Sequence, residues 1–209
     1  IRLFLGKPII AYSIEAALSS GLFDEVMVST DDEEIASIAK EYGAQVPFMR
    51  STDTSNDFST LADVLLEVIF CYEDSGIKFD NLCCILATAP LIIPEDIKNA
   101  YLKLTNSSFT SVYPVIPYSY PIMRSLKMNI DGKISMRWPE YQKVRSQDIE
   151  TSYHDSGTFY WTTIESIKNV KSILTSNCTG IVIDEIRAQD IDTEVDWKIA
   201  ELKYELLHE

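Results

Sequence analysis

Apolar residues recur along this chain with two different spacings, which predict two kinds of element. A spacing of three to four residues predicts helices, and we expect these at residues 8–20, 33–43, within 51–76, and at 95–105, 165–174 and 192–209. Continuous or β-branched apolar runs predict strands, and these lie at residues 25–30, 44–50, 81–88, 109–115, 157–164 and 179–186. Pro8 suits a first helical turn, and Gly21 and Gly43 suit helix ends.

The predicted strands and helices alternate over about the first 115 residues. This alternation is typical of a parallel sheet with helices on both faces. The run NLCCILAT (81–88) is apolar throughout, as expected of a central strand that is covered on both sides. We therefore predict an α/β fold with a mostly parallel sheet, in a single domain over residues 1–209. Ligands of such sheets bind beyond the carboxyl ends of the strands.

The alternation stops at an insertion over residues 117–150. Its stretch LKMNIDGKISMRW (126–138) alternates apolar and polar residues on both sides of Asp131-Gly132, which predicts a β-hairpin with a two-residue turn. One face of this hairpin would be apolar, with Leu126, Met128, Ile130, Ile134, Met136 and Trp138. A two-stranded hairpin is not stable alone in water. It therefore packs on its own domain or on a partner chain, and we favour a subunit interface.

The charge of the chain restricts its partners. It has 32 acidic and 18 basic residues, a formal net charge of −14. Such a chain repels a DNA or RNA backbone, so we expect no nucleic-acid partner. An anionic small substrate would need local bases or a bound cation. No apolar run approaches the ~20 residues that cross a bilayer, and no signal peptide is present, so we expect no membrane partner.

Cysteine and histidine offer little chemistry in this sequence. The four cysteines show no metal-binding spacing, and we interpret them as reduced residues of a cytoplasmic protein. The two histidines, His154 and His208, are far apart in the sequence. A zinc site or a Ser-His-Asp triad is therefore not expected.

The segment AQDIDTEVDW (188–197) carries Asp190 and Asp192 just before the last predicted helix. In an extended segment residues i and i+2 face the same way, so these carboxylates would lie side by side and repel each other. A hard divalent cation removes this repulsion, and Mg²⁺ binds one or two carboxylates together with substrate phosphates and water. The alternative is helix capping, in which Asp192 or Thr193 is the N-cap and Asp196 favours the helix dipole.

Other candidates have equally ordinary alternatives. Asp31 in STDD (29–32) follows a predicted strand, where nucleotides bind, but the motif also suits helix capping. Arg50 suits an anion or a base edge, or is simply exposed. Arg145 in RSQD (145–148) could bind a carboxylate, or lie in a solvated loop. His154 suits a catalytic or a structural role. The tyrosines Tyr118, Tyr120 and Tyr153 suit sugar stacking or ordinary packing.

Taken together, seven motifs resemble the cytidylyltransferases that activate nonulosonic (sialic-acid-like) sugars. They are GKPIIAYSIEAA (6–17), DEVMVSTDDEEIA (24–36), Arg50…Asp53-Thr-Ser…Asp63-Val, LATAPL (86–91), RSQD (145–148), HDSGTFYW (154–161) and DIDTEVDW (190–197), in family order over nearly the whole chain. The stretches VPFMRS, SYPIMRSL, ISMRWPE and YHDSGTFYW resemble the pseudaminic acid branch. The resemblance implies a Rossmann-like nucleotidyltransferase fold, a Mg²⁺ requirement, a homodimer, and transfer of CMP from CTP to a nine-carbon α-keto acid sugar.

The resemblance also implies roles for individual residues. Asp190 and Asp192 would bind the metal and form the catalytic pair. Nucleotide-binding positions would be Asp31, Arg50, Ser55, Thr60 and Thr88. Sugar-binding positions would be Arg145, Gln147, Tyr153, His154 and Phe159, with Arg145 and Gln147 reaching the other subunit's site.

The chain departs from the family pattern in two places. After the central strand it reads ATAPLI (87–92), where the family often has an arginine in place of Ile92. The family also opens with a strand and a Gly-Ser-Lys loop that cradles the triphosphate, and this loop ends where Ile1 begins, so we expect such a segment ahead of Ile1. The alternatives are the same reaction on N-acetylneuraminic or legionaminic acid, and a non-catalytic nucleotide-binding dimeric scaffold.

Overall fold

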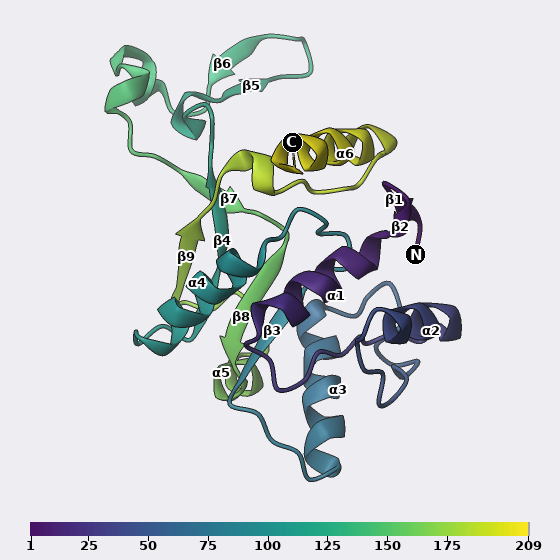
Figure 1. Cartoon of the computed structure of the whole chain (residues 1–209). Helices are drawn as coiled ribbons and strands as arrows, with labels where there is room; N and C mark the ends of the chain where they lie inside the picture. Colours follow the sequence, from purple (N-terminus) through teal and green to yellow (C-terminus); the bar gives the residue numbers. More distant parts are fainter. Residues whose placement is uncertain (209) are drawn as a thin grey trace.

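A computed structural model describes residues 1–208 of the chain (Figure 1). The centre of the molecule is a mixed five-stranded sheet. Its strands are β3 (Asn81–Ile85), β4 (Ser111–Pro117), β7 (Tyr153–Asp155), β8 (Phe159–Thr163) and β9 (Cys178–Val182). The main helices are α1 (Ile9–Ser20), α2 (Glu33–Glu41), α3 (Leu61–Asp74), α4 (Pro94–Thr105), α5 (Ile164–Val170) and α6 (Glu194–His208). The predicted helices therefore all form, with small differences at their ends.

The directions of the strands match the predicted parallel sheet only in part. Strand β9 runs parallel to β4, but β8 lies between β3 and β4 and is antiparallel to both. Strands β3, β4 and β9 consequently run in one direction, whereas β7 and β8 run in the other. The antiparallel pairing arises because the chain leaves β4 at Pro117, passes through the insertion, and returns alongside β4 as β7.

The predicted strands at 25–30 and 44–50 are not regular strands. The two segments meet at one parallel bridge, between Met27 and Gln45. Backbone hydrogen bonds at 2.8 and 2.9 Å join Gln45 to Val26 and Val28. The β-branched run therefore gives an extended, half-buried segment that lacks the ladder of a full strand.

Helices cover both faces of the sheet, as predicted. On one face, Ala16 of α1 and Ile97 and Ala100 of α4 pack against Val112 and Trp161. On the opposite face, α3 and α5 pack against the alternate residues of the strands, and this cluster contains Ile69, Tyr160, Ile167 and Ile173. The period-two alternation of β8 separates Phe159 and Trp161 from Tyr160, so one short strand contributes to both layers.

The closing helix α6 packs on the first residues of the chain. These residues form the short strands β1 (Leu3–Phe4) and β2 (Lys7–Pro8), which pair antiparallel. The Phe4 ring is fully buried and makes edge contacts with Tyr12, Trp197 and Tyr204. Arg2 lies over the Trp197 ring and forms an ion pair with Glu194 at 2.5 Å.

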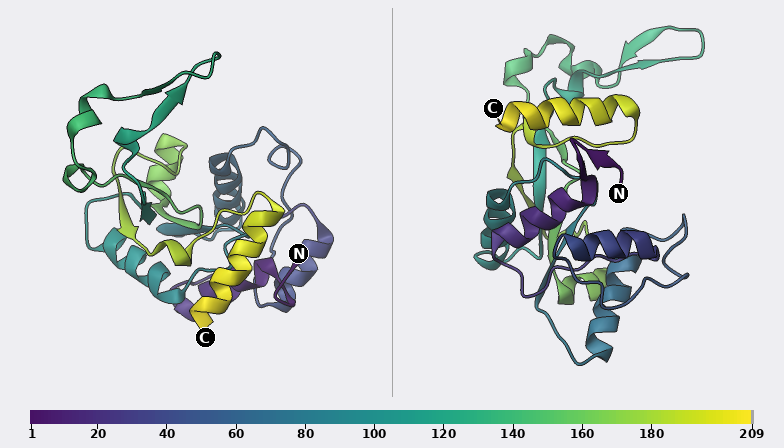
Figure 2. Two further views of the ribbon diagram at one scale, coloured as in Figure 1. Left: turned by 90° about the horizontal axis from the view of Figure 1, so that it is seen from above. Right: turned by 45° about the vertical axis from the view of Figure 1, so that its right-hand side comes forward.

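The insertion forms an arm that stands away from the body of the molecule (Figure 2). It contains strands β5 (Leu126–Met128) and β6 (Ile134–Met136) and the 3₁₀ helices η1 (Ile122–Arg124), η2 (Pro139–Lys143) and η3 (Ser146–Asp148). The hairpin is present, but its turn is longer than the predicted two residues. A backbone bond from Asn129 to Lys133 closes a three-residue turn in which Gly132 has φ +79°, a common longer hairpin loop.

Among residues 1–208, no helix is both long enough and apolar enough to cross a membrane.

Candidate functional site

The site lies at the edge of the sheet where β3, β4 and β9 end. Thr88 follows β3, and Asp190 follows β9 after the 3₁₀ helix η4 (Glu185–Arg187). Because β8 is antiparallel, its first residue Phe159 pairs with Ile85, the last residue of β3. The HDSG turn that leads into β8 therefore reaches the same edge. This is the edge at which α/β sheets bind their ligands.

The segment that leads to Asp190 is held by two basic side chains. Arg187 donates to both carboxylate oxygens of Asp96 in α4, at 2.9 and 3.0 Å. Lys203 of α6 donates to the backbone carbonyls of Glu185 and Ala188, at 2.9 and 2.8 Å. Burial raises the pKa of Asp96 and the charge of Arg187 opposes this. Asp190 thus follows a segment with little freedom to move.

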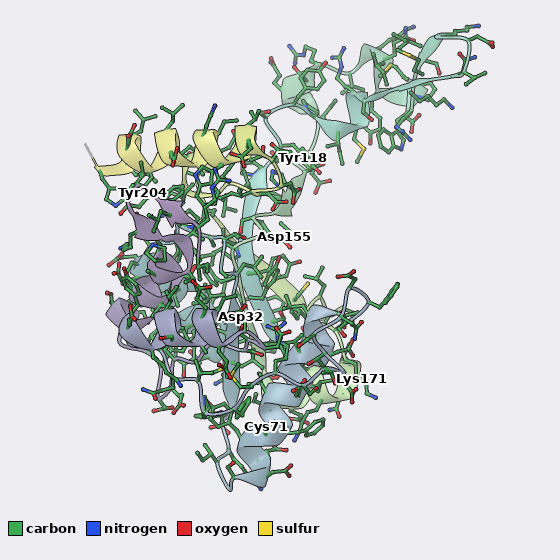
Figure 3. The ribbon with its side chains drawn as sticks, turned by 90° about the vertical axis from the view of Figure 1, so that its right-hand side faces the viewer. Asp32, Cys71, Tyr118, Asp155, Lys171 and Tyr204 are labelled. Carbon is green, nitrogen blue, oxygen red and sulfur yellow. The ribbon has the colours of Figure 1, made fainter. Side chains whose placement is uncertain are left out.

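Asp155 organises the turn beside Asp190. Its carboxylate accepts hydrogen bonds from the Gly157 N–H at 2.8 Å and from the Tyr160 hydroxyl at 2.6 Å. Gly157 has φ +64°, and a Cβ atom added there would lie 3.9 Å from the Asp190 carboxyl group. Burial, followed by the hydrogen bond to Asp155, raises the pKa of Tyr160 well above its usual value, and the charge of Asp190 adds to this. The turn is labelled at Asp155 in Figure 3.

The HDSG motif contributes to the family resemblance, but the sequence predicted no role for Asp155. The available signal was an acid two residues before a glycine, the pattern of an Asx turn in which the carboxylate accepts from the N–H two residues on. The contact with Tyr160 joins residues on two strands. Its geometry depends on the bend between β7 and β8.

The structure resolves the capping alternative at the start of α6. The Thr193 hydroxyl accepts from the Asp196 N–H at 3.3 Å, and the Asp196 carboxylate accepts from the Thr193 N–H at 2.8 Å. These reciprocal bonds form a capping box. The hydrogen bond from the Thr193 hydroxyl, together with that from its N–H, lowers the pKa of Asp196. The Asp192 side chain takes no part in the cap.

Asp190 and Asp192 are both exposed, and within residues 1–208 their carboxylates have no hydrogen-bond or ion-pair partner. No cluster of three or more His, Cys, Asp or Glu side chains in this part of the chain could hold a metal by itself. Two free carboxylates fit Mg²⁺ bound jointly with substrate phosphates and water, because Mg²⁺ keeps several such ligands. The metal role of the pair stays a prediction.

Two of the predicted nucleotide residues, Arg50 and Asp31, differ in their contacts. Arg50 donates through Nε to the Ser29 hydroxyl at 3.1 Å, and its guanidinium also contacts the Ser29 carbonyl. Asp31 is exposed, whereas its neighbour Asp32 caps α2 by accepting from Glu34 and Ile35. For STDD, capping is therefore confirmed at Asp32, and the nucleotide role of Asp31 stays a prediction.

The loop at 51–60 is built around Glu67 of α3, which sequence reasoning missed. Its carboxylate accepts from the Ser51 N–H at 2.7 Å, from the Ser51 hydroxyl at 3.1 Å, and from the Thr54 hydroxyl. Ser55 donates to the Ser51 carbonyl at 2.8 Å, and Thr60 is the N-cap of α3. The loop is thus ordered by one carboxylate, which lies nearly two helical turns inside α3.

A cavity of about 520 Å³ lies between the segment at 22–29 and β3. Val26, Val28 and Leu82 contribute to its mainly apolar lining, and Ser29, Arg50 and Ala87 also line it. Arg50 therefore lines the same cavity as Ala87, the residue before Thr88. The exposed position of Thr88 in that turn is compatible with contact to a ligand.

The predicted sugar residues are spread over the base and outer part of the arm. Arg145 is largely exposed and pairs with Asp148 at 2.8 Å. Gln147 lines a hollow of about 330 Å³ together with Tyr118 and Tyr120. Tyr153 and His154 lie exposed on β7, and the His154 ring packs on Tyr118 with centroids 4.9 Å apart.

The predicted sugar-binding role of Phe159 is wrong. Its side chain is 1% exposed and lies in the core with Ile97, Val112 and Trp161. The aromatic residues of β8 alternate between the two faces of the sheet, and Phe159 points into the layer beneath α4. It therefore packs the core behind the turn and cannot contact a sugar directly.

Comparison with known proteins agrees with this arrangement. Residues 1–178 match the family model described as cytidylyltransferase. The chain is 37% identical over 206 residues to the pseudaminic acid cytidylyltransferase of Campylobacter jejuni subsp. jejuni serotype O:2, covering 99% of this chain and 89% of that protein. It is 33% identical over 213 residues to the CMP-N,N'-diacetyllegionaminic acid synthase of Legionella pneumophila, covering 100% and 90%.

Solved structures show the same fold at low sequence identity. A CMP:2-keto-3-deoxy-manno-octonic acid synthetase complexed with CTP superposes with a TM-score of 0.66 at 16% identity, covering 99% of this chain and 90% of that one. The 4-diphosphocytidyl-2C-methyl-D-erythritol synthase of Anaerococcus prevotii gives 0.64 at 11% identity, covering 97% and 91%. The Rossmann-like nucleotidyltransferase fold is therefore confirmed. On the extent of the family match and these identities, the chain belongs to the cytidylyltransferase family.

Proposed function

We propose that this protein transfers CMP from CTP to pseudaminic acid, giving the CMP-sugar and pyrophosphate. One structural observation carries the proposal: Asp190 and Asp192, whose carboxylates have no partner within residues 1–208, follow an anchored segment at the ligand-binding edge of a cytidylyltransferase fold. The Campylobacter jejuni relative, which carries the name of this activity, aligns with 99% of the chain. The family membership makes the nucleotide CTP, and the relative's name indicates the sugar.

In this reaction the anomeric hydroxyl of the sugar attacks the α-phosphorus of CTP in line. A bond forms between the anomeric oxygen and the α-phosphorus, the bond from that phosphorus to the β-phosphate bridging oxygen breaks, and the hydroxyl loses its proton. Catalysis of this kind relies on positioning and charge neutralisation more than on covalent chemistry. The protein's part is to hold the reacting groups in line and to exclude competing geometries.

Asp190 and Asp192 would hold Mg²⁺, which when bound offsets the negative charge of the phosphates. This matters more than usual here because the chain has a formal net charge of −14 and repels a triphosphate. Arg50 lines the cavity that Ala87 also lines, and it supplies one of the few positive charges there. Its hydrogen bonds to Ser29 hold the guanidinium in place before a nucleotide arrives.

The experiment is a product assay with the full-length protein, CTP and Mg²⁺. Pseudaminic, N-acetylneuraminic and legionaminic acid are offered separately, and each CMP-sugar is identified by mass spectrometry with release of pyrophosphate as a second readout. We expect the pseudaminate product to form fastest. A faster reaction with legionaminic acid would assign that substrate, as the Legionella relative suggests. No product with any of the three would favour the non-catalytic nucleotide-binding scaffold.

We also propose that the protein works as a homodimer in the cytoplasm. The arm presents apolar side chains that the rest of its own chain leaves exposed, which favours a subunit contact. All four cysteines are free thiols, as expected in a reducing compartment where CTP is made.

A further inference from the structure

The loop at 51–60 has few contacts that hold it to the rest of the protein. Its one large apolar side chain, Phe58, is 94% exposed, so burial of apolar surface does not anchor the loop. Hydrogen bonds within the loop fix its internal shape. Among residues 1–208, however, residues 51–59 form hydrogen bonds to the remainder of the chain only at Glu67. The position of the loop therefore depends on one carboxylate.

Helix α3 holds the loop at both of its ends. At the beginning, the Glu67 carboxylate accepts from the Ser51 N–H at 2.7 Å, from the Ser51 hydroxyl at 3.1 Å and from the Thr54 hydroxyl. At the end, the Asp63 carboxylate accepts from the Thr60 N–H at 2.9 Å and from its hydroxyl at 2.7 Å. Asp63 and Glu67 are four residues apart, so one face of α3 carries both carboxylates.

This placement of Glu67 does not favour the helix itself. Two like charges at this spacing repel each other and destabilise a helix. Within residues 1–208, neither Asp63 nor Glu67 forms an ion pair with a lysine or arginine. The hydrogen bonds from the loop are therefore what offsets the repulsion, and the contribution of Glu67 is to the loop rather than to α3.

The same carboxylate fixes the backbone next to Arg50. The Arg50 N–H donates to the Thr30 carbonyl at 2.8 Å, and its side chain donates to the Ser29 hydroxyl at 3.1 Å. Ser51, the next residue, is held by Glu67 through both its N–H and its hydroxyl. The chain at Arg50 is thus fixed on both sides, and loss of the Glu67 contact would release one of them.

We propose that Glu67 is a positioning residue for the nucleotide, which holds the 51–60 loop and the backbone after Arg50 in the arrangement that CTP binds. Without this contact CTP would have to order the loop as it binds, and the free energy of ordering would be subtracted from its affinity. Glu67 contacts no substrate and acts through Ser51 and Thr54. The proposal rests on the proposed function, which takes CTP as the nucleotide and Arg50 as a residue that attracts it.

The first test compares the steady-state kinetics of three variants of the full-length protein. Glu67→Leu removes every acceptor, whereas Glu67→Gln keeps an oxygen that can accept from the Ser51 N–H. Glu73→Gln is the control, because Glu73 lies on the same helix and pairs with Lys168 at 2.6 Å but bonds to no residue of the loop.

We expect Glu67→Leu to raise the KM for CTP by about tenfold, with kcat and the KM for the sugar within about twofold of the wild type. In both glutamine variants the KM for CTP should change by less than about threefold. A Glu67→Leu protein that melts at a lower temperature but keeps the wild-type KM for CTP would overturn the proposal, because Glu67 would then be structural only. An equal rise in Glu73→Gln would overturn it as well.

The second test measures CTP binding without sugar, by isothermal titration calorimetry. Thr54→Val removes one of the three donors to Glu67, so it should weaken CTP binding less than Glu67→Leu does. The double variant should bind CTP as the Glu67→Leu protein does, because both changes remove the same contact. Losses that add in the double variant would contradict the proposal.

This binding test separates the role of Glu67 from the reaction. A wild-type protein that binds CTP but forms no product with any of the three sugars would refute the proposed function, and the comparison of the variants would still decide the role of Glu67. A wild-type protein that does not bind CTP would overturn both.

Discussion

At the residue scale, the two aspartates beside the helix start have separate tasks. Asp196 completes the capping box with Thr193, whereas Asp192 makes no side-chain hydrogen bond in the part of the chain that the structure describes. The same short segment therefore contains a structural acid and a free acid four residues apart. This separation allows stability and activity to be changed independently.

Asp192→Asn is expected to abolish turnover and leave the melting temperature within a few degrees of the wild type, because no side-chain bond is lost. Asp196→Asn is the matched control: it should lower the melting temperature by weakening the cap and retain most of the activity. Thermal melts and a pyrophosphate-release assay measure the two effects. Full turnover in Asp192→Asn would remove that residue from the metal site.

Asp155 acts through its neighbours, so we regard it as a positioning residue. Asp155→Asn removes the charge that both the Gly157 N–H and the Tyr160 hydroxyl contact. We expect the pKa of Tyr160 to fall towards its usual value, although burial still raises it. The KM for Mg²⁺ should rise by about tenfold, as for other residues that orient metal ligands.

Isotope-labelled tyrosine in a pH titration followed by NMR reports the Tyr160 change in the absence of substrates. Tyr160→Phe is the companion variant, because it removes one donor and leaves the Gly157 contact in place. A Mg²⁺ KM equal to the wild type in Asp155→Asn, with a lowered Tyr160 pKa, would limit Asp155 to a structural role.

At the element scale, the position of Asp190 depends on contacts between elements that are remote in sequence. Arg187 in η4 reaches Asp96 in α4, and Lys203 in α6 reaches the carbonyls of the same turn. The sequence pattern predicted the helices that contribute these residues, because each has a clear apolar spacing. It did not predict the pairings, because a lone arginine and an aspartate 91 residues apart carry no pattern.

Arg187→Met is expected to leave the Asp96 carboxylate buried without its counter-charge. Breaking a buried pair in this way costs about 3–5 kcal/mol, which lowers the melting temperature by roughly 10 °C in a chain of this size. The double variant Asp96→Leu/Arg187→Met should recover most of this loss, since it removes both charges. Chemical denaturation of both proteins measures the difference, and equal losses would show that the ion pair is not the cause.

The 51–60 loop should respond to acid through Glu67. Burial raises the pKa of this carboxyl, but hydrogen bonds from Thr54 and Ser51 and the charge of Arg50 lower it overall. Because its folded pKa lies below the unfolded value, its stabilisation is present above the unfolded pKa of about 4.3 and is lost as the pH falls through the folded pKa. Glu67→Gln should therefore flatten the decrease of melting temperature below about pH 4.3. Glu41→Gln, on the exposed end of α2, should leave that decrease unchanged.

At the scale of the whole molecule, the alternation of apolar runs was enough to predict the layers but not the path of the chain. Strands such as NLCCI and helices such as LADVLLEVIFCYED have strong patterns and formed where expected. The insertion of β8 antiparallel between β3 and β4 depends on how the chain returns from the arm, and no local pattern records this. Phe159 was misassigned for the same reason, because its face follows from the partner strand.

The candidate site was likewise predictable in part. The acidic pair stands out in the sequence because adjacent like charges call for an explanation. Asp155 and Glu67 do not stand out in this way. Asp155 shows only the common pattern of an Asx turn with Gly157, and Glu67 contacts the Ser51 backbone, which only the folded chain brings near. The arm adds a further level, because the partner that we propose for its apolar side chains is a second chain.

The two ends of the arm are β4 and β7, which pair with each other through Val115, Ile116 and Pro117. Asp155 is the last residue of β7, so the strand on which the arm ends also carries the side chain that sets the turn beside Asp190. A change in the position of the arm would therefore be transmitted through a few residues of backbone to the turn beside Asp190. A substitution at the tip of the hairpin would then slow product formation, although every residue that binds the nucleotide is unchanged.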